Sequence, residues 1–159
     1  AELARQITLR FPSGSATTRA LPPPPTPLAD GAYENSAVGR QAGHPLLRAV
    51  EEASGRGPLW RYLGLLADAD AALAGRLPAP SLQGDTAVVQ AARGAYALRI
   101  SQEGGRVSGL QRRTPTDHIL AKGGALDQAL SDLDPALAPL VIALHDPCIP
   151  VTVAEAQHA

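Results

Sequence analysis

Proline and glycine divide this chain of 159 residues into short segments, and these breaks constrain its fold more than any other feature of the sequence. The densest break is the proline run at residues 21–27. Such a run adopts an extended polyproline II conformation, which serves either as a stiff spacer or as a ligand for an SH3-like or WW-like partner. Before it, Ile7, Leu9 and Phe11 alternate with polar residues, which predicts a short strand.

The breaks separate an N-terminal part from the rest of the chain. Residues 1–30 are expected to form a strand-like segment followed by the proline-rich linker, and residues 31–159 to form one domain. With 45% hydrophobic residues, a domain of this length can bury a sizeable core. Aromatic residues make up only 3% of the chain and methionine is absent, so the core is expected to consist mainly of Ala, Leu and Val.

Two helices are predicted in the first half of this domain. Pro45 suits a first helical turn, and apolar residues recur every three or four positions until the Gly-Arg-Gly-Pro break at 55–58. A second helix is predicted over residues 59–73, with Arg61 and Asp68 outside its apolar stripe. The stripe consists of Leu59, Tyr62, Leu63, Leu66, Ala69 and Leu73.

The second half of the domain begins with strands. Residues 86–89 and 96–100 are rich in β-branched and aromatic or aliphatic side chains, and both are predicted strands. Gly104 and Gly105 form a turn into a third strand at 107–110. These segments predict an antiparallel β-hairpin.

The C-terminal part is predicted to be helical and buried. A last helix is expected over residues 126–133, and the apolar segment at 137–144 indicates that the end of the chain lies inside the molecule. The expected fold class is therefore α+β, mainly helical, with a small antiparallel β-hairpin or sheet.

Charge and motif content exclude several classes of function. The net charge is −1, which offers no broad attraction for nucleic acid or anionic lipid. No apolar run approaches the roughly 18 residues that would span a bilayer. No nucleophile–base pair, phosphate-binding glycine loop or complete metal site can be identified. We expect a cytoplasmic protein that is not an enzyme and binds neither nucleic acid nor membranes.

Four short motifs follow one another along the chain in an order that resembles that of a known protein family. They are Glu-Asn-Ser-Ala-Val-Gly-Arg at 34–40, Arg-Gly at 93–94, Thr-Pro-Thr at 114–116 and Asp-Pro-Cys at 146–148. Together they resemble the C-terminal half of the nickel–iron hydrogenase large subunit, in which such motifs surround a binuclear metal centre. The resemblance implies a hydrogenase large-subunit-like fold for the domain that follows the linker.

The chain departs from the large subunit at its metal ligands. Val151 stands where the large subunit has its second C-terminal cysteine, and Ala154 where it has its closing histidine. His118 and Ile119 replace the Trp and Asn that follow the Pro-Thr pair. A bridging thiolate is lost, so a working hydrogenase is not expected. Hydrogenase expression/formation proteins of the HupK type have such degenerate ligands, and this chain resembles the C-terminal portion of one.

The resemblance to HupK-type proteins implies an accessory function in nickel–iron hydrogenase maturation. It implies a scaffold that transiently holds iron carrying cyanide and carbonyl ligands and transfers it to the large subunit. Arg93 and Thr116 match cyanide-binding positions, with Pro115 in the same loop, and Cys148 matches a cysteine that binds metal. The implied partners are hydrogenase maturation proteins and the large subunit.

Each of these residues also has a purely structural interpretation. Cys148 is the only cysteine, and free cysteines are commonly small buried hydrophobes. Arg93 fits a solvated or ion-paired strand residue, and Thr116 fits an ordinary turn. His145 lies three residues before the cysteine and could orient or protonate its thiolate. Without metal, the chain would instead be an interaction module that mimics the large subunit and docks maturation chaperones.

Overall fold

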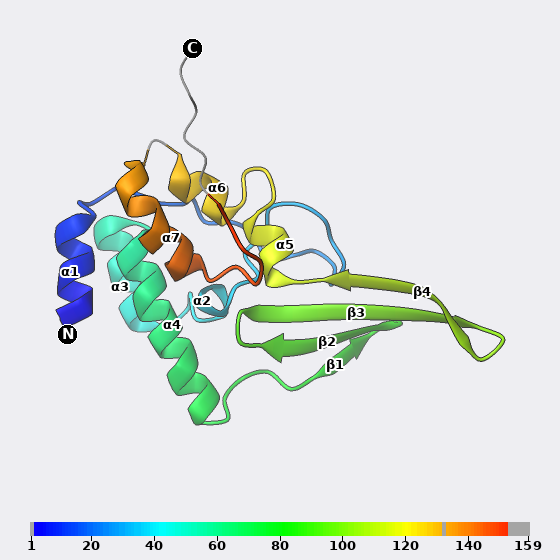
Figure 1. Cartoon of the computed structure of the whole chain (residues 1–159). Coiled ribbons are helices and arrows are strands. Elements are labelled where there is room, and N and C mark those ends of the chain that lie inside the picture. The colour runs from blue at the N-terminus through cyan, green and yellow to red at the C-terminus, as the bar shows by residue number, and fades with distance from the viewer. Residues whose placement is uncertain (1, 132, 153–159) are drawn as a thin grey trace, which may run out of the picture.

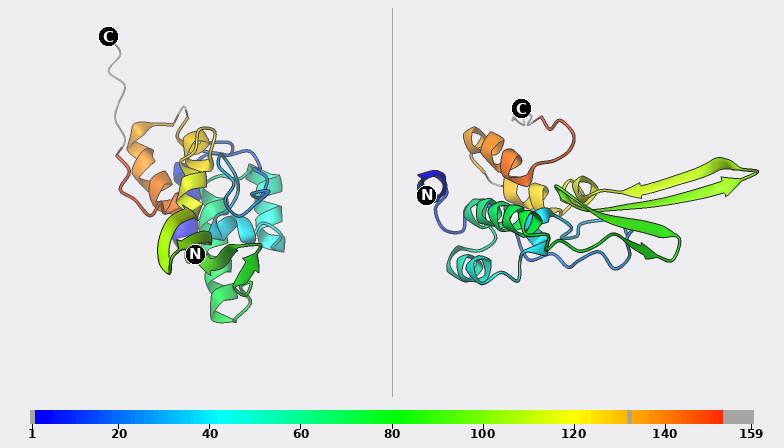
Figure 2. Two further views of the ribbon diagram at one scale, coloured as in Figure 1. Left: turned by 90° about the vertical axis from the view of Figure 1, so that its right-hand side faces the viewer. Right: turned by 90° about the horizontal axis from the view of Figure 1, so that it is seen from below.

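The computed structural model describes residues 2–131 and 133–152. A four-stranded antiparallel sheet extends to one side from a helical body (Figures 1 and 2). The described helices are α1 (Glu2–Arg10), α2 (Ala37–Arg40), α3 (Pro45–Ser54), α4 (Pro58–Leu73), α5 (Pro115–Ile119), α6 (Ala125–Leu130) and α7 (Ala138–His145), with a 3₁₀ turn at Pro135–Leu137. The described strands are β1 (Ser81–Gln83), β2 (Thr86–Ala91), β3 (Gly94–Glu103) and β4 (Arg106–Arg113). The predicted α+β class is confirmed, whereas the likeness to the large-subunit fold stays a prediction.

The two helices predicted in the first half of the domain are present. α3 begins at Pro45 and ends before Gly55, whose φ of 78° lies in the left-handed region that favours glycine. α4 begins at Pro58, because a residue without an N–H suits the first turn of a helix. The two helices pack through Leu47 and Trp60, which are fully buried.

The predicted apolar stripe of α4 is wrong. Leu66 is 51% exposed and Leu73 is 90% exposed, whereas Arg61 and Asp68 are buried. Gly64 lies so close to α2 that a Cβ there would be 2.2 Å from a side chain of that helix. α4 therefore packs on α2 through a face made of a glycine and charged residues that pair inside the protein. Apolar periodicity does not detect such a face.

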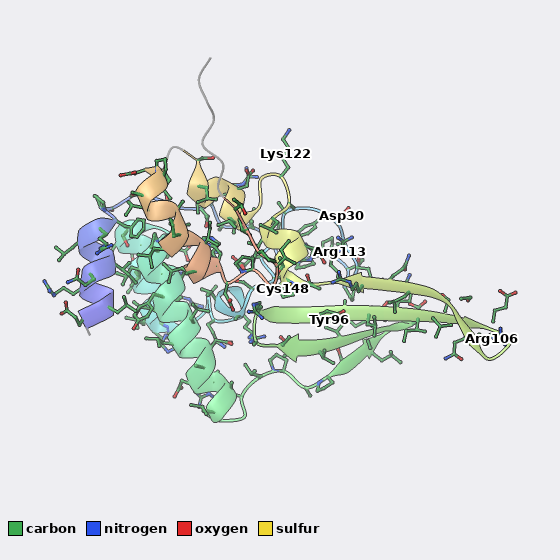
Figure 3. All side chains as sticks on the ribbon, in the orientation of Figure 1. Asp30, Tyr96, Arg106, Arg113, Lys122 and Cys148 are labelled. Carbon is green, nitrogen blue, oxygen red and sulfur yellow. The ribbon has the colours of Figure 1, made fainter. Side chains whose placement is uncertain are left out.

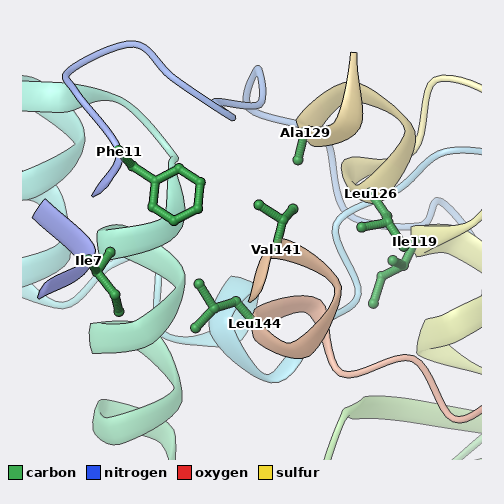
Figure 4. Packing of buried hydrophobic residues seen from close by; sticks show 7 residues of the cluster. All are labelled: Ile7, Phe11, Ile119, Leu126, Ala129, Val141 and Leu144. Carbon is green, nitrogen blue, oxygen red and sulfur yellow. The ribbon is translucent and has the colours of Figure 1, made fainter. Parts of the chain in front are cut away.

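The predicted strand at the N-terminus is also wrong, because these residues form helix α1. Ile7 and Phe11 lie one helical turn apart, and both are buried in a hydrophobic cluster with Val141 and Leu144 (Figure 4). Leu9 faces outward and is 64% exposed. Three alternating apolar positions fit a strand, but the first and the third also lie on the same face of a helix. Burial of these two against the core selects the helix.

The proline run lies against the sheet. Residues 21–27 contain neither helix nor strand. Pro24 and Pro25 share a cavity with Val88 of β2 and Ala97 of β3, so the run covers one face of the sheet near its base. The polyproline II conformation and the division of the chain at residue 30 stay predictions.

The sheet contains the three predicted strands in β2, β3 and β4. Its strand order equals the order along the chain, and every neighbouring pair is antiparallel. Gly104 and Gly105, with φ values of 56° and 72°, form the predicted turn between β3 and β4. β1 was not predicted, because a three-residue edge strand leaves little periodic signal.

The C-terminal helices complete the helical body. The helix predicted over 126–133 is present as α6 and ends at Leu130, and the apolar segment at 137–144 forms most of α7. Asp146 ends α7 in the left-handed conformation, with a φ of 46°, and the chain then runs over the surface. The predicted burial of the chain end is wrong, since Cys148 is exposed. The cluster that α6 and α7 share with α1 and α5 consists of Ile7, Phe11, Ile119, Leu126, Ala129, Val141 and Leu144 (Figure 4).

No helix among the described residues is long and apolar enough to cross a lipid bilayer.

Candidate functional site

A tight turn between β2 and β3 presents Arg93. The next residue, Gly94, has a φ of 137°, and a Cβ there would lie 1.8 Å from the backbone oxygen of Asn35 and 2.8 Å from Cγ of Pro115. Only glycine tolerates both this conformation and this close approach. The Ala37 N–H donates to the Arg93 carbonyl at 2.9 Å. The Arg-Gly pair is therefore fixed between the starts of α2 and α5.

The Thr-Pro-Thr segment starts α5 with a capping box. The Thr114 hydroxyl accepts from the Asp117 N–H at 3.3 Å, and the Asp117 carboxylate accepts from the Thr114 N–H at 2.7 Å. Pro115 occupies the first helical turn. Thr116 is buried, and its Oγ1 accepts a hydrogen bond from the Cys148 N–H at 3.0 Å. This bond attaches the segment that carries the cysteine to α5.

Arg93 joins the sheet to the same C-terminal segment. Its Nε donates to the Asp146 backbone oxygen at 2.8 Å, and its Nη2 donates to the Asp146 carboxylate at 3.0 Å. The two side chains are 39% and 50% exposed, so water screens the ion pair and its contribution to stability is small. The contact nevertheless sets the direction of the guanidinium, since two of its nitrogens have fixed acceptors.

The four predicted site residues line one cavity of about 220 Å³. Arg93 comes from the sheet, Pro115 and Thr116 from α5, and Cys148 from the segment after α7, which lies beside the start of α5 in Figure 3. The tertiary structure thus brings together residues that are up to 55 positions apart in the sequence. Their role as a binding site stays a prediction. The other residues that line the cavity are Ala91, Ala92, Tyr96, Arg112 and Thr114.

A second hollow of about 270 Å³ adjoins this cavity and shares Arg112, Thr114, Thr116 and Cys148 with it. Cys148 is therefore accessible from two sides. Sequence reasoning did not assign Arg112 to the site, although its position two residues before the Thr-Pro-Thr segment is a signal that could have found it.

His145 does not act on the thiolate in the way that its spacing suggested. It is buried, its Nδ1 hydrogen-bonds to the Val141 carbonyl oxygen at 2.8 Å, and it does not line either hollow at Cys148. Burial, and next the positive charge of Arg61, lower the pKa of His145 to about 3. The imidazole is therefore neutral near pH 7 and has no proton to give to a thiolate.

A buried ionic network supports the turn that presents Arg93. Arg40 of α2 donates from Nε and Nη2 to the two carboxylate oxygens of Asp68, each at 2.6 Å, and from Nη2 to the Ala91 carbonyl at 3.0 Å. Arg61 is fully buried, which lowers its pKa, and a carboxylate oxygen of Glu34 lies 3.9 Å from its guanidinium. The motif at 34–40 thus joins α4 to the end of β2. The sequence indicated this motif, but it did not predict that Asp68 pairs with Arg40.

The comparisons with known proteins agree with the motifs. No family model and no solved structure matches the chain. Over 156 residues the chain is 47% identical to the hydrogenase expression/formation protein HupK of Rhodobacter capsulatus. The match covers 94% of this chain and 51% of that relative, so the chain spans about half of the relative's length. The predicted resemblance to HupK-type proteins is confirmed.

Any metal at this site would have to bring most of its own ligands. Cys148 is the single cysteine, and the described residues contain no group of three or more His, Cys, Asp or Glu side chains placed to bind a metal together. Val151 carries no donor atom in its side chain, and Ala154 lies outside the described residues. Closed protein sites for transition metals generally need about four ligands. Iron that already carries cyanide and carbonyl ligands meets this condition.

Proposed function

We propose that the chain acts in nickel–iron hydrogenase maturation as an accessory protein, and that its Cys148 cavity holds iron with cyanide and carbonyl ligands as cargo for the large subunit. The likeness to HupK, a hydrogenase expression/formation protein, supports the first part. The proposed partners are the large subunit and other maturation proteins. No catalytic step is assigned to the chain.

The observation that carries the second part is the shared cavity of Arg93, Thr116 and Cys148. A thiolate is a soft ligand suited to iron, and Cys148 is exposed, so cargo can reach it without unfolding the protein. Pro115 and Ala92 add wall surface without donor atoms, beside which a carbonyl ligand needs no hydrogen bond.

Arg93 and Thr116 supply the hydrogen-bond donors that a metal-bound cyanide accepts. The contact with Asp146 occupies Nε and Nη2 of Arg93, and no acceptor for Nη1 is found among the described residues. The Thr116 hydroxyl accepts from the Cys148 N–H and keeps its own hydrogen for donation. Hydrogen bonds to a bound cyanide add no bond to the iron, so both groups would hold the cargo and still allow its release.

Infrared spectroscopy tests the cargo directly, because metal-bound cyanide and carbonyl absorb where proteins do not. The protein would be co-produced with the hydrogenase maturation proteins and purified without oxygen. We expect such bands in the natural protein, their loss in Cys148→Ser, and a weaker or shifted cyanide band in Arg93→Ala. Arg99→Ala is the matched control, since Arg99 lies on β3, the strand that follows the Arg93 turn, but pairs with Asp85 outside the cavity.

A second function, a docking module without metal, is favoured by the presence of only one thiolate. In that case the preparations would carry iron-free protein without infrared bands, yet would still bind the large subunit or a maturation protein. Bands that persist in Cys148→Ser would contradict the cargo site at this cysteine.

A further inference from the structure

The two faces of the sheet have different surroundings. Opposite residues of antiparallel neighbours share a face, so the register of the strands assigns each side chain to one side. Thr86, Val88 and Ala97 lie on the face that the proline run covers, and Thr86 and Ala97 are buried. The chain thus protects the base of one face of the sheet with its own residues.

The opposite face is apolar and uncovered, and we refer to it as the open sheet face. Its large side chains lie in register across all four strands: Leu82 of β1, Val89 of β2, Tyr96, Leu98 and Ile100 of β3, and Leu110 of β4. Leu82 is 72% exposed and Leu110 is 61% exposed. Single exposed apolar residues are ordinary, but a contiguous set on one face is typical of an interaction surface.

The charge on the open sheet face is positive. Arg112 is directly opposite Leu98, is exposed, and forms no ion pair with residues 2–131 or 133–152. The register places no Asp or Glu side chain on this face. Arg112 and Tyr96 also line the Cys148 cavity, so the face and the cavity are continuous.

We propose that the open sheet face docks an amphipathic helix of another protein, whose apolar side covers Val89, Ile100 and Leu110 and whose carboxylate pairs with Arg112. Helices cover sheet faces, whereas added strands pair at sheet edges. A second copy of this chain does not fit, because two open sheet faces would bring together arginines without a carboxylate. The docked helix would border the Cys148 cavity. The proposal does not depend on whether that cavity holds iron.

Photo-crosslinking in cells that produce hydrogenase tests this surface. A photoreactive phenylalanine derivative replaces Leu110, and the matched control carries it at Leu73, which is 90% exposed at the end of α4. Mass spectrometry then identifies the cross-linked peptide. We expect an adduct from the Leu110 position with a helical segment that has apolar residues on one side and Asp or Glu beside them, and no such adduct from Leu73.

Charge reversal supplies the second arm of the experiment. Arg112→Glu should lower the adduct yield about fivefold or more, since an attractive contact becomes repulsive. Arg106→Glu makes the same change of charge on the same strand, but its pairing with Glu103 places it on the other face, and it should leave the yield unchanged. Circular dichroism verifies that both variants fold. The proposal is overturned by the absence of an adduct, by adducts only with a second copy or with lipid, by a segment without acidic residues, or by equal effects of the two reversals.

Discussion

Gly94→Ala is the substitution whose effect the structure predicts most directly. The glycine has a φ of 137°, and an added Cβ would lie 1.8 Å from the Asn35 oxygen and 2.8 Å from the Pro115 ring. Neither neighbour can move freely, because Asn35 donates from Nδ2 to the Ala95 carbonyl at 2.9 Å and Pro115 begins α5. The substitution must therefore displace the turn that carries Arg93.

The expected loss has two parts. A residue with a Cβ in this backbone region costs about 1–3 kcal/mol, and forcing extra volume into a packed contact costs about 1–3 kcal/mol more. We expect Gly94→Ala to lower the free energy of unfolding by about 2–6 kcal/mol, a large share of the roughly 5–15 kcal/mol typical of a domain.

Urea denaturation followed by circular dichroism measures this loss. Gly105→Ala is the matched control, because Gly105 also has a positive φ, of 72°, but has no atom within 4 Å of an added Cβ. That variant should lose only about 1 kcal/mol, from backbone strain. Equal losses in the two variants would refute the reasoning, since they would show that the close approach to Asn35 and Pro115 does not matter.

Three further predictions concern buried and exposed groups. Asp68→Ala leaves the charge of Arg40 without its buried partner and should lower the free energy of unfolding by about 3–5 kcal/mol, measured by thermal or urea denaturation. The control Asp70→Ala breaks an exposed pair and should lower it by under about 1 kcal/mol. Similar losses in the two variants would contradict the burial of the Asp68 pair. Burial lowers the pKa of His145 in the folded protein to about 3, from the ordinary 6.5 that it has in the unfolded chain. The unfolded chain therefore binds the proton first, and stability present above pH 6.5 falls as the pH is lowered toward 3. Between pH 7 and pH 5 the loss should be about 2 kcal/mol, and an equal loss in His145→Gln would assign it to other groups. Cys148 should react with a thiol reagent in the native protein as fast as in the urea-unfolded protein within about tenfold, and a requirement for denaturant would show that the thiol is buried.

The candidate site could be predicted from the sequence only as a set of separate residues. Arg93, Thr116 and Cys148 were identified through short motifs in a particular order, without a spatial argument. Their common cavity depends on two contacts between distant segments, the Cys148 N–H to Thr116 Oγ1 and the Arg93 guanidinium to Asp146. Such contacts have no local periodicity, so no pattern in the sequence predicts them.

The sequence by itself determined where α3 and α4 begin and where the chain turns between β3 and β4. Pro45, Pro58 and the Gly104-Gly105 turn act through the fixed φ of proline and the permissive φ of glycine, which are properties of single residues. Only the tertiary structure decided which side of each element is buried. Arg61 and Asp68 are inside because charged partners meet them there, and Cys148 is outside because α7 ends at Asp146 and the chain continues over the surface. Burial depends on what a residue meets across space, and the alternation of apolar residues along one segment does not contain that information.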